Sequence, residues 1–197
     1  TKEGYFHPDY STFAKLYMRG KINRAEVQEE LTAQYEKVRY AGIRPTHFDS
    51  HQHIHHFPGI MGVAIKLAKQ AKVSAMRIAS TKVFGGSIDG IGLSSLAKIA
   101  ENSARSNGIA TPDHFVGSVA GDSITKDFMI NAINNLEEGV TEIMIHPGTD
   151  NETLQYFCNW SHDFEEELDA LVSPKIMRLL DTKKLTLIDF SELKLRR

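Results

Sequence analysis

Segments typical of β-strands alternate with segments typical of α-helices along the chain, and this alternation constrains the fold more than any other feature. Short apolar runs typical of strands occupy residues 46–50, 74–79, 114–118, 140–145 and 185–188. Helical spacing of apolar residues begins at Asn23 and at Pro58, and it recurs at residues 93–105, 126–136 and 164–172. Strand and helix units that recur roughly every 30 residues predict parallel strands joined by crossover helices.

Two α/β architectures have parallel strands of this kind, the open doubly wound sheet and the (β/α) barrel. No glycine-rich dinucleotide-binding fingerprint follows an early strand, which disfavours the open sheet. We therefore expect a distorted (β/α) TIM-like barrel. Because an ordinary barrel has about eight strands, we expect this one to be incomplete in the chain, with N-terminal strands missing. We expect residues 1–197 to form a single domain.

Composition excludes several classes of function. The 23 basic and 25 acidic residues give a formal charge of −2, which is too balanced for a nucleic-acid-binding protein. No apolar run reaches the roughly 18 residues that a membrane-spanning helix needs. The single cysteine, Cys158, cannot form an intramolecular disulfide, and we expect it to be a packed small side chain in a cytoplasmic protein.

Histidines are concentrated in one short segment. Five of the nine lie within ten residues, namely His47, His51, His53, His55 and His56. His51 and His53 follow Asp49 where a strand gives way to a loop, and such strand ends gather ligands in α/β proteins. Imidazole and carboxylate groups are common ligands of divalent ions. We expect His51, His53 or both to bind a metal, His55 and His56 to support the site or face substrate, and His47 to be structural; each histidine could instead pack or face water.

Other strand ends also carry polar residues. Arg77 lies among apolar residues of a strand, so it either needs an anionic partner or a cavity, or occupies an exposed strand position. Asp113 and His114 follow Pro112 at a turn-like entry, which suits either sugar hydroxyls or an ordinary turn. His146 ends an apolar strand and precedes Pro147, so its imidazole is the strongest catalytic candidate.

These residues resemble a known family. Residues 45–55, Pro-Thr-His-Phe-Asp-Ser-His-Gln-His-Ile-His, resemble the central signature of the YdjC-like carbohydrate deacetylases, the family of the chitooligosaccharide deacetylases. Residues 4–8, 111–117 and 142–148 resemble further parts of that family's pattern, the last being a strand that ends in His-Pro-Gly.

The resemblance implies a metal-dependent hydrolase that removes N-acetyl groups from amino sugars or chitooligosaccharides, with a Mg or Zn ion. It implies that His51 is a metal ligand and His146 the catalytic acid. Arg77, Asp113, His114 and His53 would bind or orient substrate or catalytic groups. The family's other two metal ligands come from an Asp-Asp-Phe-Gly motif and a second N-terminal motif. No Asp-Asp-Phe-Gly occurs in the 197 residues, so we expect that an N-terminal portion is missing.

Two other functions remain open from the sequence. A different metal-dependent barrel hydrolase, of the amidohydrolase or phosphoesterase type, would bind metal through both His51 and His53. A non-catalytic sugar-binding relative would lack the metal. For the deacetylase we expect an N-acetylated amino sugar or oligosaccharide as substrate, no nucleic-acid or membrane partner, and a homodimer.

Overall fold

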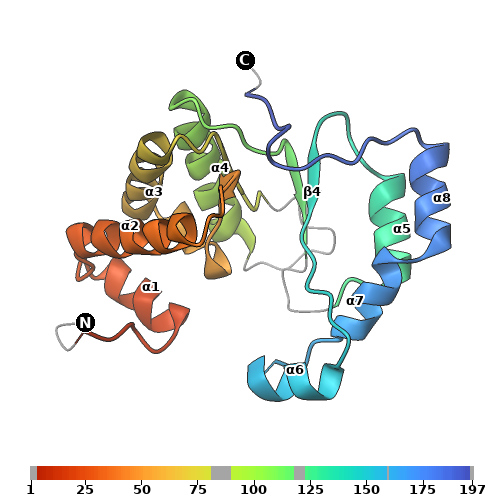
Figure 1. Cartoon of the computed structure of the whole chain (residues 1–197), viewed down its shortest axis with the longest axis horizontal. Helices are drawn as coiled ribbons and strands as arrows, with labels where there is room; N and C mark the ends of the chain where they lie inside the picture. The colour runs from red at the N-terminus through yellow and green to blue at the C-terminus, as the bar shows by residue number, and fades with distance from the viewer. Residues whose placement is uncertain (1–3, 81–89, 118–122, 159, 196–197) are drawn as a thin grey trace. The chain divides into compact units, whose positions relative to one another are not determined.

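The computed structural model describes residues 4–80, 90–117, 123–158 and 160–195. Its contacts divide the chain into two compact units. Unit 1 comprises Thr1–Ile78, Ser95–Thr111 and Phe190–Arg197, and unit 2 comprises Ala79–Ser94 and Pro112–Asp189. The described elements combine helices with parallel strands, so the fold is α/β (Figure 1).

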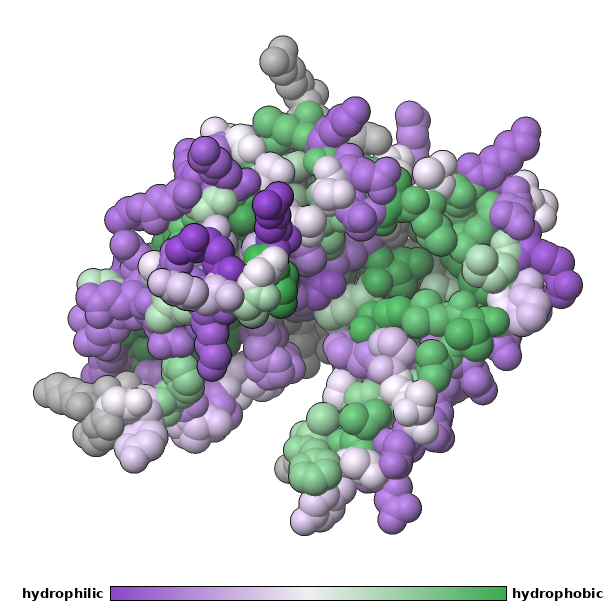
Figure 2. Space-filling view, viewed as in Figure 1, coloured by the Kyte–Doolittle hydropathy of each residue, from purple (hydrophilic) through white to green (hydrophobic). Residues whose placement is uncertain are grey.

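Helices predominate in unit 1. Its elements are α1 (Tyr10–Met18), α2 (Arg24–Tyr40), β1 (His47–Phe48), the 3₁₀ segment η1 (His51–His56), α3 (Pro58–Ala71), β2 (Ala75–Met76) and most of α4 (Gly90–Ser106). The Asn23 side chain accepts the Ala25 N–H at 3.0 Å and so caps α2, as the sequence predicts. No residue of α2 is fully buried, and Figure 2 shows the polar surface over this helix.

Three parallel segments position the histidine-rich stretch in unit 1. β1 pairs with β2, with His47 opposite Ala75 and Phe48 opposite Met76. β2 in turn bridges Ala110 in parallel. The Arg77 N–H donates to the Phe48 carbonyl at 2.9 Å, which fixes the point where β1 ends. The residues after Phe48 therefore leave the sheet at its carboxyl end, where ligands gather in α/β folds.

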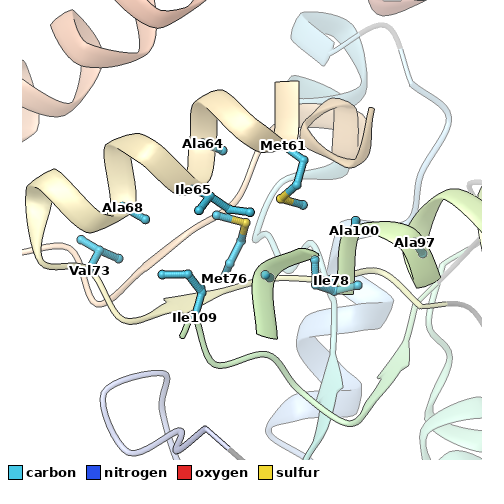
Figure 3. Close-up of a cluster of buried hydrophobic side chains, with 11 residues drawn as sticks. Met61, Ala64, Ile65, Ala68, Val73, Met76, Ile78, Ala97, Ala100 and Ile109 are labelled. Carbon is cyan, nitrogen blue, oxygen red and sulfur yellow. The ribbon is translucent and has the colours of Figure 1, made fainter. Parts of the chain in front are cut away.

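The core of unit 1 lies between α3, β2 and α4 (Figure 3). Met61, Ile65 and Met76 are almost completely buried. The facing positions of α4 are the small residues Ala97, Ala100 and Ala104, which let this helix pack closely. This core includes α3, the helix that follows the histidine-rich stretch directly in the chain.

Unit 2 is built around a second pair of parallel strands. β3 (His114–Val116) pairs with β4 (Thr141–Ile143), and α5 (Lys126–Asn134), α6 (Asn151–Cys158), α7 (Phe164–Leu171) and α8 (Pro174–Thr182) complete it. α5 packs on α7 and α8 around Ile124, Met129 and Ile133. Several apolar residues around this core, including Ile143 and Ile145, are only partly buried, and apolar surface is visible around α5 in Figure 2.

The structure confirms most expected elements and corrects others. Four of the five expected strands occur in shorter form, and Ser118, at the end of one, lies outside the described residues. Residues 185–188 are not a strand, and Leu187 is 73% exposed. β4 is half-buried and not fully buried as its apolar pattern suggested. The described strands form two two-stranded sheets and no closed barrel. Cys158 is exposed, so its prediction as a packed side chain is wrong.

Candidate functional site

The histidine-rich segment begins with an unusual backbone. After Phe48 the chain passes through Asp49 and Ser50 into η1, and two consecutive residues, Gln52 and His53, have φ values of +54° and +53°. Left-handed conformations of residues other than glycine cost on the order of 1 to 2 kcal/mol each. Such strain persists where the surroundings enforce it, and it is concentrated at binding and active sites. The strain lies directly beside His51.

Two of the five clustered histidines have structural roles. His55 is buried; its Nδ1 lies 2.6 Å from the Ser50 hydroxyl, and its Nε2 lies 2.8 Å from the Arg77 carbonyl. Because a carbonyl oxygen only accepts, Nε2 carries the proton and Nδ1 accepts from Ser50. Burial lowers the pKa of His55. Burial, together with the neighbouring His55 and His53, lowers the pKa of His56 to about 3. Both imidazoles are therefore neutral supports of the turn.

Asp49 and Arg77 form an ion pair next to this turn. The Arg77 side chain is 20% exposed and that of Asp49 is 28% exposed, so the pair is mostly shielded from solvent. Burial raises the pKa of Asp49, but hydrogen bonding by His53 and the charge of Arg77 outweigh it and lower the pKa to about 2. The expectation that Arg77 needs an anionic partner is confirmed, because Asp49 is that partner.

His51 differs from the other residues of the turn. Its side chain is exposed, whereas His55 and His56 are buried and the Asp49 carboxylate is engaged by Arg77. His53 is half-buried, and its Nδ1 lies 3.7 Å from Asp49. An exposed imidazole at the end of a parallel strand suits a divalent ion as one ligand. His51 can therefore contribute one imidazole to a divalent ion.

His146 lies in unit 2, three residues beyond the end of β4. It is half-buried, and its ring meets those of Trp160 and His162 edge-on, with centroids 5.1 and 5.5 Å apart. Its backbone N–H donates to the Glu167 carboxylate. The sequence predicts His146 at the tip of a strand; the strand is shorter than expected, so His146 lies in the segment that follows it.

A cluster around His146 was not predicted from the sequence. His146, His162 and Glu167 each present one potential ligand atom, and these atoms lie within 4.8 Å of one another. Glu167 follows two other glutamates at the start of α7, where acidic residues are ordinary partners of the helix dipole. The only sequence signal was the nearness of His162 to Glu167, five residues apart across a helix start.

Asp113 and His114 lie at the other end of the strand pair from His146. His114 is the first residue of β3 and pairs with Thr141, the first residue of β4. Asp113 Oδ2 accepts the Val140 N–H at 2.9 Å, and His114 Nε2 lies 3.1 Å from the Glu138 carbonyl. Because parallel strands begin at one edge and end at the other, this placement favours a structural role over orientation of His146.

Parallel strands joined by helices make this an α/β protein. Its candidate functional residues, His51 and His146, each follow the carboxyl end of a strand. The comparison with known families makes this specific. The chain belongs to the YdjC-like protein family, whose profile matches residues 1–182.

Relatives with similar sequences are named carbohydrate deacetylases. The chain is 27% identical over 170 residues to a carbohydrate deacetylase of Geobacillus stearothermophilus, covering 86% of this chain and 60% of the relative. It is 29% identical over 174 residues to carbohydrate deacetylase 1 of Listeria innocua, covering 87% of this chain and 61% of the relative. The chain thus spans about three fifths of the length of these relatives.

A solved structure supports the fold. The chain matches a crystal structure from Enterococcus faecalis, provisionally named a cellobiose-phosphate cleavage protein, with a TM-score of 0.65 and 22% identity. The match covers 89% of this chain and 63% of that one. Among the residues that the structure describes, no helix combines the length and apolar character needed to cross a bilayer.

Proposed function

We propose that this chain forms part of a metal-dependent hydrolase that removes N-acetyl groups from amino sugars or their oligosaccharides. The observation that carries the proposal is the family match over residues 1–182, with relatives named carbohydrate deacetylases. The exposed imidazole of His51 beyond β1 and the half-buried imidazole of His146 beyond β4 supply groups that this chemistry needs.

Amide hydrolysis requires three events. A water oxygen bonds to the acetyl carbon while a base takes its proton, the carbonyl oxygen gains negative charge, and the carbon–nitrogen bond then breaks. The amine is a poor leaving group unless its nitrogen is protonated. In our proposal His146 gives a proton to that nitrogen, so the products are acetate and the free amino sugar. Imidazole is the side chain most often used for such proton transfer.

We propose His51 as the ligand that this chain contributes to a divalent ion, Mg²⁺ or Zn²⁺. Such an ion, when bound, activates water and polarises the acetyl carbonyl. His53 and the Asp49–Arg77 pair border the same turn, and in our proposal they orient His51 or the sugar. Asp113 and His114 make bonds at the start of β3 and β4, and their role in binding or orienting substrate stays a prediction.

We further propose that the two strand pairs belong to one distorted (β/α) barrel domain and that the active protein is a homodimer. The parallel pairing of both strand pairs and the structural match support the first part.

The test is release of acetate from N-acetylglucosamine and from chitooligosaccharides of increasing length by the natural full-length protein. We expect activity with at least one of zinc, magnesium, cobalt and nickel, loss on chelation, and recovery when the ion is restored. Release of no acetate from any of these sugars with any of the four metals would overturn the proposal.

A further inference from the structure

The side chain of Glu167 joins three segments of unit 2 that are distant in sequence. Its Oε1 accepts the N–H of Ile124, just before α5, at 2.8 Å. Its Oε2 accepts the N–H of His146, beyond β4. Oε1 also lies 3.0 Å from Nε2 of His162, just before α7. Glu167 is only 1% exposed, so all of these contacts are shielded from water.

A carboxylate so deeply buried needs donors to replace its lost hydration. Two backbone N–H groups supply them, one to each oxygen, and the His162 imidazole lies within 3.0 Å of Oε1. Hydrogen bonds to an ionised acceptor are shorter and stronger than those between neutral groups. This set of contacts fits an anchor for the backbone, because each oxygen already faces a donor.

The anchored backbone lies beyond the ladder that the described residues form. Among those residues, the last ladder bond of this strand is donated by Met144 to the Val116 carbonyl at 2.8 Å. Beyond it, His146 donates to Glu167, Pro147 has no N–H, and Gly148 donates to the Phe164 carbonyl at 3.0 Å. The segment that carries His146 is thus tied to the first turn of α7.

The ring of His146 is confined by the same cluster. Trp160 and His162 stack with centroids 3.9 Å apart and an interplanar angle of 23°. His146 meets both rings edge-on, at 84° and 87°. The Ser123 hydroxyl, 3.4 Å from Nδ1 of His162, lies on the side of that ring away from Glu167. Glu167 therefore contacts both the backbone of His146 and one of the two rings that border its imidazole.

We infer that Glu167 is a positioning residue for His146: it holds the backbone and the neighbouring His162 so that the His146 imidazole can deliver its proton to the leaving amine. The inference rests on the proposed function for that last step. In this inference Glu167 positions His146 and does not bind a metal. The atoms of His146, His162 and Glu167 are also close enough together to hold a metal ion, so the two roles must be distinguished.

The kinetic test compares Glu167→Gln with Glu166→Gln, a matched change at an exposed position of the same helix. A donor-bearing amide cannot accept from every partner of Glu167, so we expect kcat on an N-acetylated sugar to fall about 10- to 100-fold, which is at most the lower end of the 10²- to 10⁴-fold contribution of acid catalysis, with KM changed less than twofold. Metal content should equal that of the wild type. Glu166→Gln should behave as the wild type.

Comparing substrates with different leaving groups distinguishes a specific loss of acid catalysis from a general loss of activity. The leaving group of 4-nitrophenyl acetate needs no protonation, so a variant impaired only in acid catalysis should retain wild-type rates with it. We expect Glu167→Gln and His146→Ala both to be defective on the amide and near normal on the ester. Equal losses on both substrates, or loss of metal with Glu167→Gln, would overturn the inference.

A measurement on the wild type tests the inference even if the variant does not fold or the protein is not a deacetylase. The amide proton of His146 should resonate downfield in the NMR spectrum and exchange slowly, as expected for a buried N–H that donates to a carboxylate. A random-coil shift with fast exchange would overturn the inference whatever the enzyme's activity. If the shift is as expected but the wild type releases no acetate, the anchor is upheld and only the deacetylase proposal fails.

Discussion

At the residue scale, neighbouring histidines of one motif have different environments and therefore different chemistry. His55 is held by Ser50 and by the Arg77 carbonyl in the interior, whereas His51, four residues earlier, is exposed. The sequence predicts a functional cluster of histidines. In the structure, His55 supports the turn, and His51 is the candidate metal ligand. The division could not be predicted, because it depends on the left-handed turn at Gln52 and His53 and on the strand beside it.

Substitutions of His51 and of His146 should have different effects on metal binding and on activity. We expect His51→Ala to lose bound metal and activity together, since it removes the one exposed imidazole of the turn. His146→Ala should keep its metal while kcat falls by about 10² to 10⁴, the usual contribution of acid catalysis. Metal content by elemental analysis and acetate release measure the two effects. Equal metal content in wild type and His51→Ala would contradict the ligand assignment.

The Asp49–Arg77 pair should make stability depend on acidity. The Asp49 pKa is lowered to about 2, against about 3.9 for an unfolded chain, so the folded state binds fewer protons between these values. Its contribution is therefore complete above about pH 4 and is lost as the pH falls towards 2. Urea unfolding should show that the wild type loses more free energy of unfolding over this interval than Asp49→Asn does.

The exposed residue Asp169 provides the comparison for that experiment, because Asp169→Asn should leave the pH dependence as in the wild type. Arg77→Ala at pH 7 should cost about 1 kcal/mol, since side chains that keep some solvent contact are partly screened. If Asp49→Asn and wild type respond identically to acid, the ion pair has no net effect on stability.

At the scale of elements, the order of helices and strands can be predicted from the local sequence pattern. How deeply each element is buried cannot be predicted in this way. Asn23 and Pro58 correctly mark the starts of α2 and α3, because capping and proline geometry are local effects. The apolar run at 140–145 does form a strand, but one that is half-buried. Residues 185–188 have a strand-like composition without a strand, since pairing depends on a partner that the local sequence does not specify.

Two glycine substitutions should have opposite effects on stability. A Cβ at Gly148 would lie 2.3 Å from Leu154 Cδ1 and 3.0 Å from Phe164 Cβ, so Gly148→Ala should destabilise unit 2 by about 1 to 3 kcal/mol. A Cβ at Gly62, inside α3, would meet no atom within 4 Å. Gly62→Ala should therefore stabilise the protein by about 0.5 to 1 kcal/mol.

Denaturant midpoints measure both changes. Leu154→Ala combined with Gly148→Ala should recover part of the loss, because it removes the closer of the two clashing groups. A Gly148→Ala protein as stable as the wild type would show that the segment after β4 is packed less tightly against α6 and α7.

At the scale of the whole molecule, the family profile spans residues 1–182, and the chain covers about three fifths of the length of its relatives. Each unit has its own buried cluster, around Met76 in unit 1 and around Ile124 in unit 2. Each also carries one of the two candidate residues, His51 and His146. The deacetylase proposal requires that the two residues serve one site.

A paramagnetic ion tests that requirement directly. With Mn²⁺ bound to the natural full-length protein, we expect the imidazole signals of His146 to broaden strongly, and those of His114, at the opposite end of the β3–β4 pair, to broaden less. His51→Ala should abolish both effects by removing the ion. Unbroadened His146 signals in a metal-loaded protein would separate the two residues and exclude a shared site.

The sequence by itself determined the family, the α/β class and the two strand-end histidines, because motif, periodicity and capping are encoded in residues close together along the chain. Tertiary structure alone decided which histidines are buried, which carboxylate pairs with Arg77, and how Glu167 comes to hold His146. Those contacts join residues 21 to 43 positions apart, and their partners are chosen by packing and by the need of buried charges for donors.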